Sequence, residues 1–124
     1  MDVTPYLGLR WQAMGRGPSF DCWGLVRHVL AHEFDVDVPS FRYGDDPTDA
    51  LRLGMALFVQ VGTPAVGDVV LFVRPLHIGL LVLPRQMLHI THNKDSCIER
   101  LDGFRVRRAA GYYRLRGEGA TTPV

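Results

Sequence analysis

The feature that most restricts the fold is the order of the periodic segments, because helical spacing comes first and short strands follow. Residues 20–34 carry apolar side chains at helical spacing, and Pro47–Val59 suits a second helix with Pro47 near its first turn. After a turn at residues 62–67, β-rich runs occupy Asp68–Arg74, His77–Leu83, Met87–Thr91, Cys97–Leu101 and Ala110–Arg116. This order predicts an α+β fold, in which N-terminal helices pack on an antiparallel sheet of about five strands.

The size and charge of the chain limit its partners. Its 124 residues suit a single domain spanning 1–124, and a content of 47% hydrophobic and 22% charged residues is typical of a folded globular chain. A net charge of +1 lacks the basic excess of nucleic-acid-binding proteins, so we expect no nucleic-acid partner. Because no apolar run reaches membrane-spanning length, we also expect no membrane insertion.

Two further features of the composition bear on function. The first residues, Met1–Pro5, lack the basic and apolar regions of a secretory signal peptide. Of the 14 lysine and arginine residues, all except Lys94 are arginines. This bias fits a GC-rich genome, but it also fits bidentate binding of carboxylates. Four of these arginines flank the motifs described below: Arg10, Arg16, Arg42 and Arg74.

Cys22 falls at the first position of the helix predicted over residues 20–34, with Asp21 as its N-cap. The positive end of a helix dipole stabilises a thiolate and lowers the pKa of a cysteine placed there. Cys22 is therefore a candidate nucleophile, although a small buried core residue is the alternative interpretation. Cys97 lies on a later strand and is interpreted as a packing residue.

The five histidines divide into two groups. His28 and His32 lie four residues apart on the helix, but no neighbouring carboxylate–histidine cluster completes a metal site, so we interpret them as a solvated face. We expect neither a metal nor another cofactor. His77 and His89 lie on neighbouring strands of a predicted hairpin and can sit side by side on one face, or else be two separate core residues. His92 ends its strand and is expected to be exposed.

Four segments together resemble the NlpC family of cell-wall cysteine peptidases, which have a papain-like fold. Phe20-Asp21-Cys22-Trp23-Gly24-Leu25-Val26 is similar to the nucleophile motif of that family. Gly67-Asp68-Val69-Val70-Leu71-Phe72 resembles the strand before the base, and His77-Ile78-Gly79-Leu80-Leu81 resembles the base motif. Leu88-His89-Ile90 falls where the third, orienting residue belongs.

The resemblance implies a catalytic role for each motif. Cys22 would be the nucleophile, His77 the base and His89 the residue that orients the base. The backbone N–H of Cys22 would be the first oxyanion donor. Trp11, near the position of a family tyrosine, would be the second, and Asp21 and Trp23 join this oxyanion and substrate-binding group. Because His89 is neutral, we expect only a modest drop in the pKa of Cys22.

The aromatic Trp23 and the segment Gly111-Tyr112-Tyr113-Arg114 resemble the phage-tail branch of the family. This likeness implies a peptidoglycan endopeptidase of a phage tail tip. It would cut a stem-peptide amide between D-glutamate and a diamino acid during genome delivery, beside other tail-tip proteins. The virion would carry the enzyme to the host wall, in agreement with the absence of signal-peptide features. Two alternatives remain open: a structural tail-tip protein that keeps the fold, and an amidase or acyltransferase that uses the same Cys-His-His triad.

Two kinds of small or polar residue are interpreted as structural. Gly24 and Gly79 are expected to allow close backbone approach, which would bring Cys22 near the strand of His77. Gly67 and Asp68 are interpreted as the turn and the start of a strand.

Overall fold

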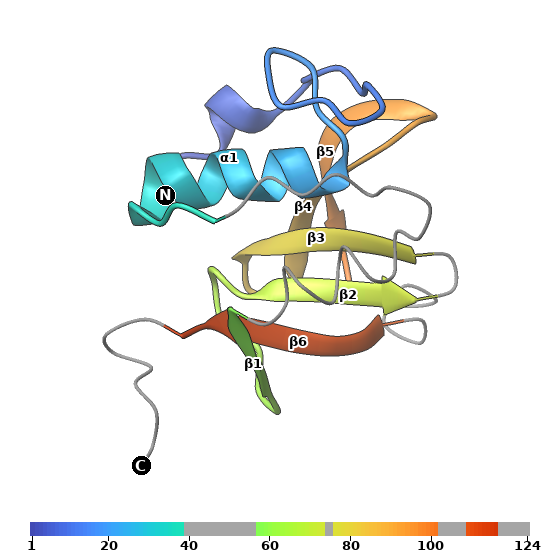
Figure 1. Cartoon of the computed structure of the whole chain (residues 1–124). Coiled ribbons are helices and arrows are strands. Elements are labelled where there is room, and N and C mark those ends of the chain that lie inside the picture. The colour runs from blue at the N-terminus through green and yellow to red at the C-terminus, as the bar shows by residue number, and fades with distance from the viewer. Residues whose placement is uncertain (39–56, 74–75, 102–108, 117–124) are drawn as a thin grey trace.

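A computed structural model describes residues 1–38, 57–73, 76–101 and 109–116 of the chain. Their elements in chain order are η1 (Thr4–Tyr6), α1 (Cys22–Phe34), β1 (Phe58–Val61), β2 (Val69–Val73), β3 (Leu76–Leu83), β4 (Gln86–Thr91), β5 (Lys94–Arg100) and β6 (Ala109–Leu115). Figure 1 shows α1 lying along one side of the sheet, beside β3 and β4, with η1 above it. The α+β class expected from the sequence is confirmed.

Helix α1 begins and ends where its capping residues predict. The Asp21 side chain accepts the backbone N–H of Gly24, and Asp35 closes the helix in the left-handed conformation with its N–H bonded to the Leu30 carbonyl. One face of the helix is buried, and it carries Trp23, Gly24, Leu25, Val26, Val29 and Leu30. Within the described residues, no helix combines the length and the apolar character needed to cross a membrane.

The strands form one antiparallel sheet in the order β1-β6-β2-β3-β4-β5. The register pairs Leu80 with Leu88 and Leu81 with Met87. Because side chains alternate between faces along a strand, this register puts His77 and His89 on the same face of the β3–β4 hairpin. The β4–β5 register then places Cys97 directly opposite His89.

Side-chain alternation also divides the core in two. Ile78, Leu80 and Val82 of β3 belong to the cluster that packs against the buried face of α1. A second cluster contains Leu81 with Val70, Phe72, Met87 and Leu101. The sheet therefore buries apolar side chains on both faces, which explains why β2 and β3 read as nearly continuous apolar runs in the sequence.

One predicted element is corrected at its end. The helix expected over Pro47–Val59 lies mostly outside the described residues, but Phe58 and Val59 belong to strand β1. Phe58 pairs with Leu115 of β6, and its side chain is buried. This pairing joins segments far apart in the chain, so local periodicity did not indicate it. It brings the described strands to six rather than about five.

An ion pair anchors β6 to the start of β2. Asp68 is buried, and its two carboxylate oxygens accept the Arg114 Nε at 2.8 Å and Nη2 at 2.9 Å. The backbone N–H of Ala65 donates to the same carboxylate at 2.7 Å. Asp68 thus has a structural role, as the sequence indicated, and its specific partner is Arg114. This bidentate geometry is a strong form of side-chain pairing.

Replacing Arg114 by methionine is expected to lower the free energy of unfolding by about 1–3 kcal/mol, because Asp68 would stay buried without its partner. The Arg114 side chain is 44% exposed, and solvent screening keeps the expected loss in this lower range. Urea unfolding measures the effect. Arg116→Met is the control, since that residue is also exposed on the same segment. Equal losses in the two variants would contradict a specific role for the Asp68 pair.

Candidate active site

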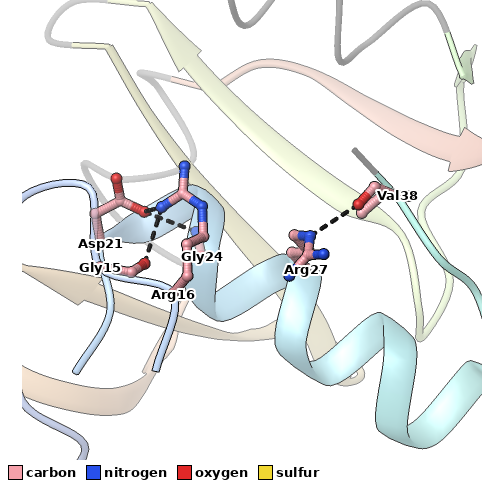
Figure 2. A network of polar contacts seen from close by, with 6 residues as sticks. All are labelled: Gly15, Arg16, Asp21, Gly24, Arg27 and Val38. Atoms are coloured by element: carbon pink, nitrogen blue, oxygen red, sulfur yellow. Dashed lines mark hydrogen bonds and ion pairs between the residues drawn. The ribbon is translucent and has the colours of Figure 1, made fainter. Parts of the chain in front are cut away.

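A network of polar contacts holds the N-terminus of α1 (Figure 2), the helix that begins at Cys22. One oxygen of Asp21 accepts the Gly24 N–H at 2.7 Å and the Arg16 Nη1 at 2.8 Å. Arg16 also donates to the carbonyl oxygen of Gly15 at 2.8 Å. Arg16 therefore ties the preceding loop to the cap, and this contact engages one of the arginines that the sequence offered as a carboxylate binder.

The sulfur of Cys22 lies against strand β3, where it receives the backbone N–H of Ile78, the residue after His77. Burial raises the pKa of the Cys22 thiol to about 11, and the neighbouring Asp21 carboxylate also raises it. The N–H groups of Ile78, Trp23 and Cys22 act in the opposite direction but do not compensate. The expected modest drop is therefore wrong for this resting state, because desolvation of the thiolate outweighs the helix N-terminus.

The two histidines that the sequence placed on one hairpin are in direct contact. His77 Nε2 and His89 Nδ1 are 2.8 Å apart, and the rings meet edge to face with centroids 5.1 Å apart. Both residues are buried, His89 almost completely. The His77 ring also packs against Phe72, its partner on β2. The structure thus brings His77 and His89 together, and His77 lies on β3, the strand that Cys22 contacts.

A fourth polar residue, which the sequence interpretation missed, lies behind His89. Glu99 Oε1 is 3.1 Å from His89 Nε2 and 3.3 Å from Lys94 Nζ. In the sequence, Glu99 reads as one polar residue of a strand with mixed character. Only the β4–β5 register, which pairs Met87 with Glu99 and His89 with Cys97, reveals its place beside His89.

His89, Cys97 and Glu99 also form the one group in the described residues whose ligand atoms could hold a metal ion, all within 4.8 Å of one another. The sequence interpretation did not find this group. His89 and Glu99 already meet at hydrogen-bond distance. Both cysteines are free thiols, and Cys97 is partly buried.

The residues assigned to oxyanion and substrate binding occupy three different environments. The Trp11 side chain is 39% exposed, and its ring contacts His92 with centroids 6.0 Å apart. The Trp11 backbone forms a bridge with Phe20, which keeps it near the start of α1. Asp21 is buried, and its second carboxylate oxygen has no hydrogen-bond partner among the described residues.

Trp23 has a different environment from the one expected of a substrate-binding side chain. Its side chain is buried in the core, and its ring meets Phe58 edge to face with centroids 6.5 Å apart. The structure therefore gives this side chain a packing role, while the backbone N–H of Trp23 faces the Cys22 sulfur.

The remaining histidines fall outside the site. His28 is not simply solvated, because its ring packs on Phe20 with centroids 4.8 Å apart and on Tyr6 at 5.6 Å. Burial lowers the pKa of His28, and the neighbouring His32 lowers it as well. His92 is exposed, as expected.

Among the arginines proposed to bind carboxylates, Arg10 is exposed, while Arg42 and Arg74 lie outside the described residues.

Close backbone approach at two glycines is confirmed, but the partners differ from those expected. A Cβ at Gly24 would lie 2.1 Å from the Gly15 carbonyl oxygen, so this glycine lets the loop, rather than β3, approach the helix. A Cβ at Gly79 would lie 2.8 Å from Met87 Sδ and 3.4 Å from the Cβ of His89. Gly79 therefore brings β4, with His89, close to β3.

We expect Gly24→Ala to lower the free energy of unfolding by about 1–3 kcal/mol, because the new methyl group would collide with a backbone oxygen that cannot rotate away. Gly62→Ala is a matched control, since a Cβ there would meet nothing within 4 Å. Urea unfolding of both variants measures the difference. If Gly24→Ala is as stable as Gly62→Ala, the contact between the loop and α1 is not needed for folding.

Comparisons with known proteins agree with this fold. The NlpC/P60 family model matches residues 5–109. The NlpC/p60 domain of the peptidoglycan hydrolase SagA is similar with a TM-score of 0.64 and 16% identity, over 90% of this chain and 91% of that chain. A search of curated proteins found no match.

Two longer proteins contain a domain of the same fold. An NlpC/P60 family protein from Bacillus cereus ATCC 10987 is similar with a TM-score of 0.69 and 19% identity, over 89% of this chain and 36% of that chain. A protein from Staphylococcus aureus subsp. aureus Mu50, described as similar to lipoprotein, NLP/P60 family, is similar with a TM-score of 0.64 and 18% identity. The similarity covers 90% of this chain and 38% of that chain. This chain therefore spans less than half the length of either protein.

Proposed function

Because the chain belongs to the NlpC/P60 family, we propose that it is a cysteine peptidase that hydrolyses a peptide amide of the bacterial cell wall. The observation that carries the proposal is the buried contact between His77 and His89, whose Nε2 and Nδ1 atoms lie 2.8 Å apart. The residue after His77, Ile78, directs its backbone N–H to the Cys22 sulfur. A thiol, a base and a group that orients the base, arranged in series, are the parts that nucleophilic amide hydrolysis requires.

The geometry supports a definite sequence of proton transfers. His77 Nε2 is engaged by His89, so its Nδ1 accepts the proton of Cys22 while the sulfur attacks the amide carbon. Because the pKa of the thiol is raised to about 11, proton removal accompanies the attack rather than preceding it. His77 then protonates the departing amine as the C–N bond breaks, and a water molecule, deprotonated by His77, hydrolyses the thioester and restores the thiol.

Two groups near the helix start are proposed to bind the reacting amide. The backbone N–H of Cys22 would donate to the oxyanion, and one such donor typically contributes about 10²–10³ in turnover. The indole N–H of Trp11 is the proposed second donor. Asp21, which the sequence placed in the same group, instead caps α1 with one carboxylate oxygen, and its second oxygen is buried.

The proposed substrate is the stem peptide of peptidoglycan, cut between D-glutamate and a diamino acid. Support comes from the domain of SagA, which is described as a peptidoglycan hydrolase. This peptide is rich in carboxylates, which an exposed arginine such as Arg10 can bind. The proposed setting is a phage tail tip, where the virion would carry the protein, with other tail-tip proteins, to the host wall. This part rests on the likeness of Trp23 and Gly111–Arg114 to the phage-tail branch.

Zymography on purified peptidoglycan tests the proposed activity. Wild-type protein is expected to clear the embedded wall material, and Cys22→Ala is expected to leave it intact. If the wild type clears nothing, and tails that carry Cys22→Ala assemble normally, the protein is a structural tail component and the peptidase proposal is wrong.

A further inference from the structure

We propose that Glu99 is a positioning residue of this site, which then has four members in series: Cys22, His77, His89 and Glu99. The role rests on the proposed function, because it is defined through the base that His77 supplies. The inference goes beyond the three residues that the sequence motifs indicated, and it comes from a contact between β4 and β5.

The sheet holds Glu99 directly behind His89. Met87 and His89 lie two residues apart on β4, opposite Glu99 and Cys97 on β5, so these four side chains share one face. Glu99 Oε1 lies 3.1 Å from His89 Nε2. The His89 side chain is completely buried, whereas that of Glu99 is 27% exposed. The partly exposed carboxylate of Glu99 thus contacts the buried His89 ring at the nitrogen that does not face His77.

This contact determines where the ring protons reside. A carboxylate can only accept a hydrogen bond, so His89 must carry its proton on Nε2. Neutral His89 then presents an unprotonated Nδ1, which accepts the Nε2–H of His77 across the distance of 2.8 Å. The lone pair of His77 is therefore left on Nδ1, where a base for Cys22 requires it.

Without the carboxylate, the opposite arrangement becomes available. His89 could carry its proton on Nδ1 and donate to His77 Nε2, which would put the His77 proton on Nδ1. His77 could not then accept the proton of Cys22. Glu99 therefore selects the reactive member of two hydrogen-bonded arrangements that the histidine pair alone would allow.

The charge of Glu99 adds a second effect. When His77 takes up a proton, the nearby carboxylate stabilises the imidazolium through the neutral His89 ring. Lys94 Nζ, 3.3 Å from the same carboxylate oxygen, opposes this effect, but its side chain is 51% exposed and is screened by solvent. Cys97 is the other titratable group of the cluster.

Two substitutions separate these effects. Glu99→Ala removes both acceptor and charge, and we expect kcat to fall about 10- to 100-fold, as is typical when a group that orients another ligand or base is lost. KM is expected to change little. Glu99→Gln keeps an acceptor for His89 but removes the charge, so its kcat should fall less. In both variants the acid limb of the kcat/KM profile is expected to move to lower pH, because loss of the negative charge disfavours the protonated form of His77 and so lowers its pKa.

Cys97→Ser is the matched control, because Cys97 faces His89 on the same strand as Glu99. It should leave rate and pH profile unchanged. If Cys97→Ser and treatment with a chelator each reduce the rate as much as Glu99→Ala, the three residues hold a metal ion and the positioning role is wrong. If Glu99→Ala lowers the rate without moving the acid limb, Glu99 acts only through the fold.

A spectroscopic measurement keeps this proposal separate from the proposed function. The ¹⁵N resonances of the histidine rings report which nitrogen carries the proton, whether or not the protein cleaves any substrate. In the wild type we expect His89 protonated on Nε2 and His77 protonated on Nε2, and in Glu99→Ala a mixture of tautomers at both rings. A wild-type spectrum with the His89 proton on Nδ1, or an unchanged spectrum in Glu99→Ala, would overturn the proposal even if wall hydrolysis is found.

Discussion

Replacing Cys22 by alanine is expected to abolish hydrolysis of purified cell wall, lowering the rate by roughly 10³-fold or more. The sulfur forms the bond to the amide carbon, and no other group in the proposed sequence of steps can take its place. Binding and oxyanion stabilisation by the helix N-terminus survive the substitution, so a small residual rate above the uncatalysed reaction is compatible with the proposal. The release of new amino groups from purified sacculi measures the rate.

The second free thiol provides the control for this substitution. Cys97→Ser should hydrolyse the wall at the wild-type rate, since Cys97 takes no part in the proposed bond-forming steps. If Cys97→Ser loses activity while Cys22→Ala keeps it, the nucleophile has been assigned to the wrong cysteine.

Replacing His77 by alanine is expected to lower the rate near neutral pH by roughly 10²–10⁴-fold, the usual contribution of a general base. The remaining rate should then increase with pH. Without a base, only the thiolate reacts, and burial raises the pKa of Cys22 to about 11. At pH values below about 11, the thiolate population therefore grows about tenfold for each unit by which the pH rises. Rates measured from pH 6 to pH 10 for the wild type and the variant reveal the difference.

His32→Ala is the control for a histidine outside the site, because His32 is exposed on α1. It should retain both the rate and the pH profile of the wild type. A His77→Ala rate that does not respond to pH, or one within tenfold of the wild type at neutral pH, would contradict the role of His77 as the base.

Local features of the fold were predictable from the sequence, because short-range physics determines them. Asp21 was expected to cap α1, and its side chain accepts the Gly24 N–H at 2.7 Å. The strands β2 to β6 also lie within one or two residues of the predicted runs, except β5, which begins three residues earlier, at Lys94. Turn residues and β-rich runs indicated these boundaries without knowledge of the partners.

Features that depend on contacts distant in sequence were not predictable in the same way. Strand β1 is stabilised by pairing with β6, and neither segment shows that pairing by itself. Glu99 gains its place beside His89 only through the β4–β5 register. The environment of Cys22 was predicted in the wrong direction, because the position at the helix start was visible in the sequence but its burial was not.

Mass spectrometry of muropeptides, digested in parallel with wild type and Cys22→Ala, tests the central proposal most directly. It reports activity, the bond cut and the nucleophile in one experiment. We expect the wild type to release stem peptides cleaved between D-glutamate and the diamino acid, with a free amine and a free carboxylate at the cut, and Cys22→Ala to release none. Identical muropeptides from both proteins would contradict the proposed role of Cys22. A product in which the acyl group is joined to another amine would indicate an acyltransferase instead.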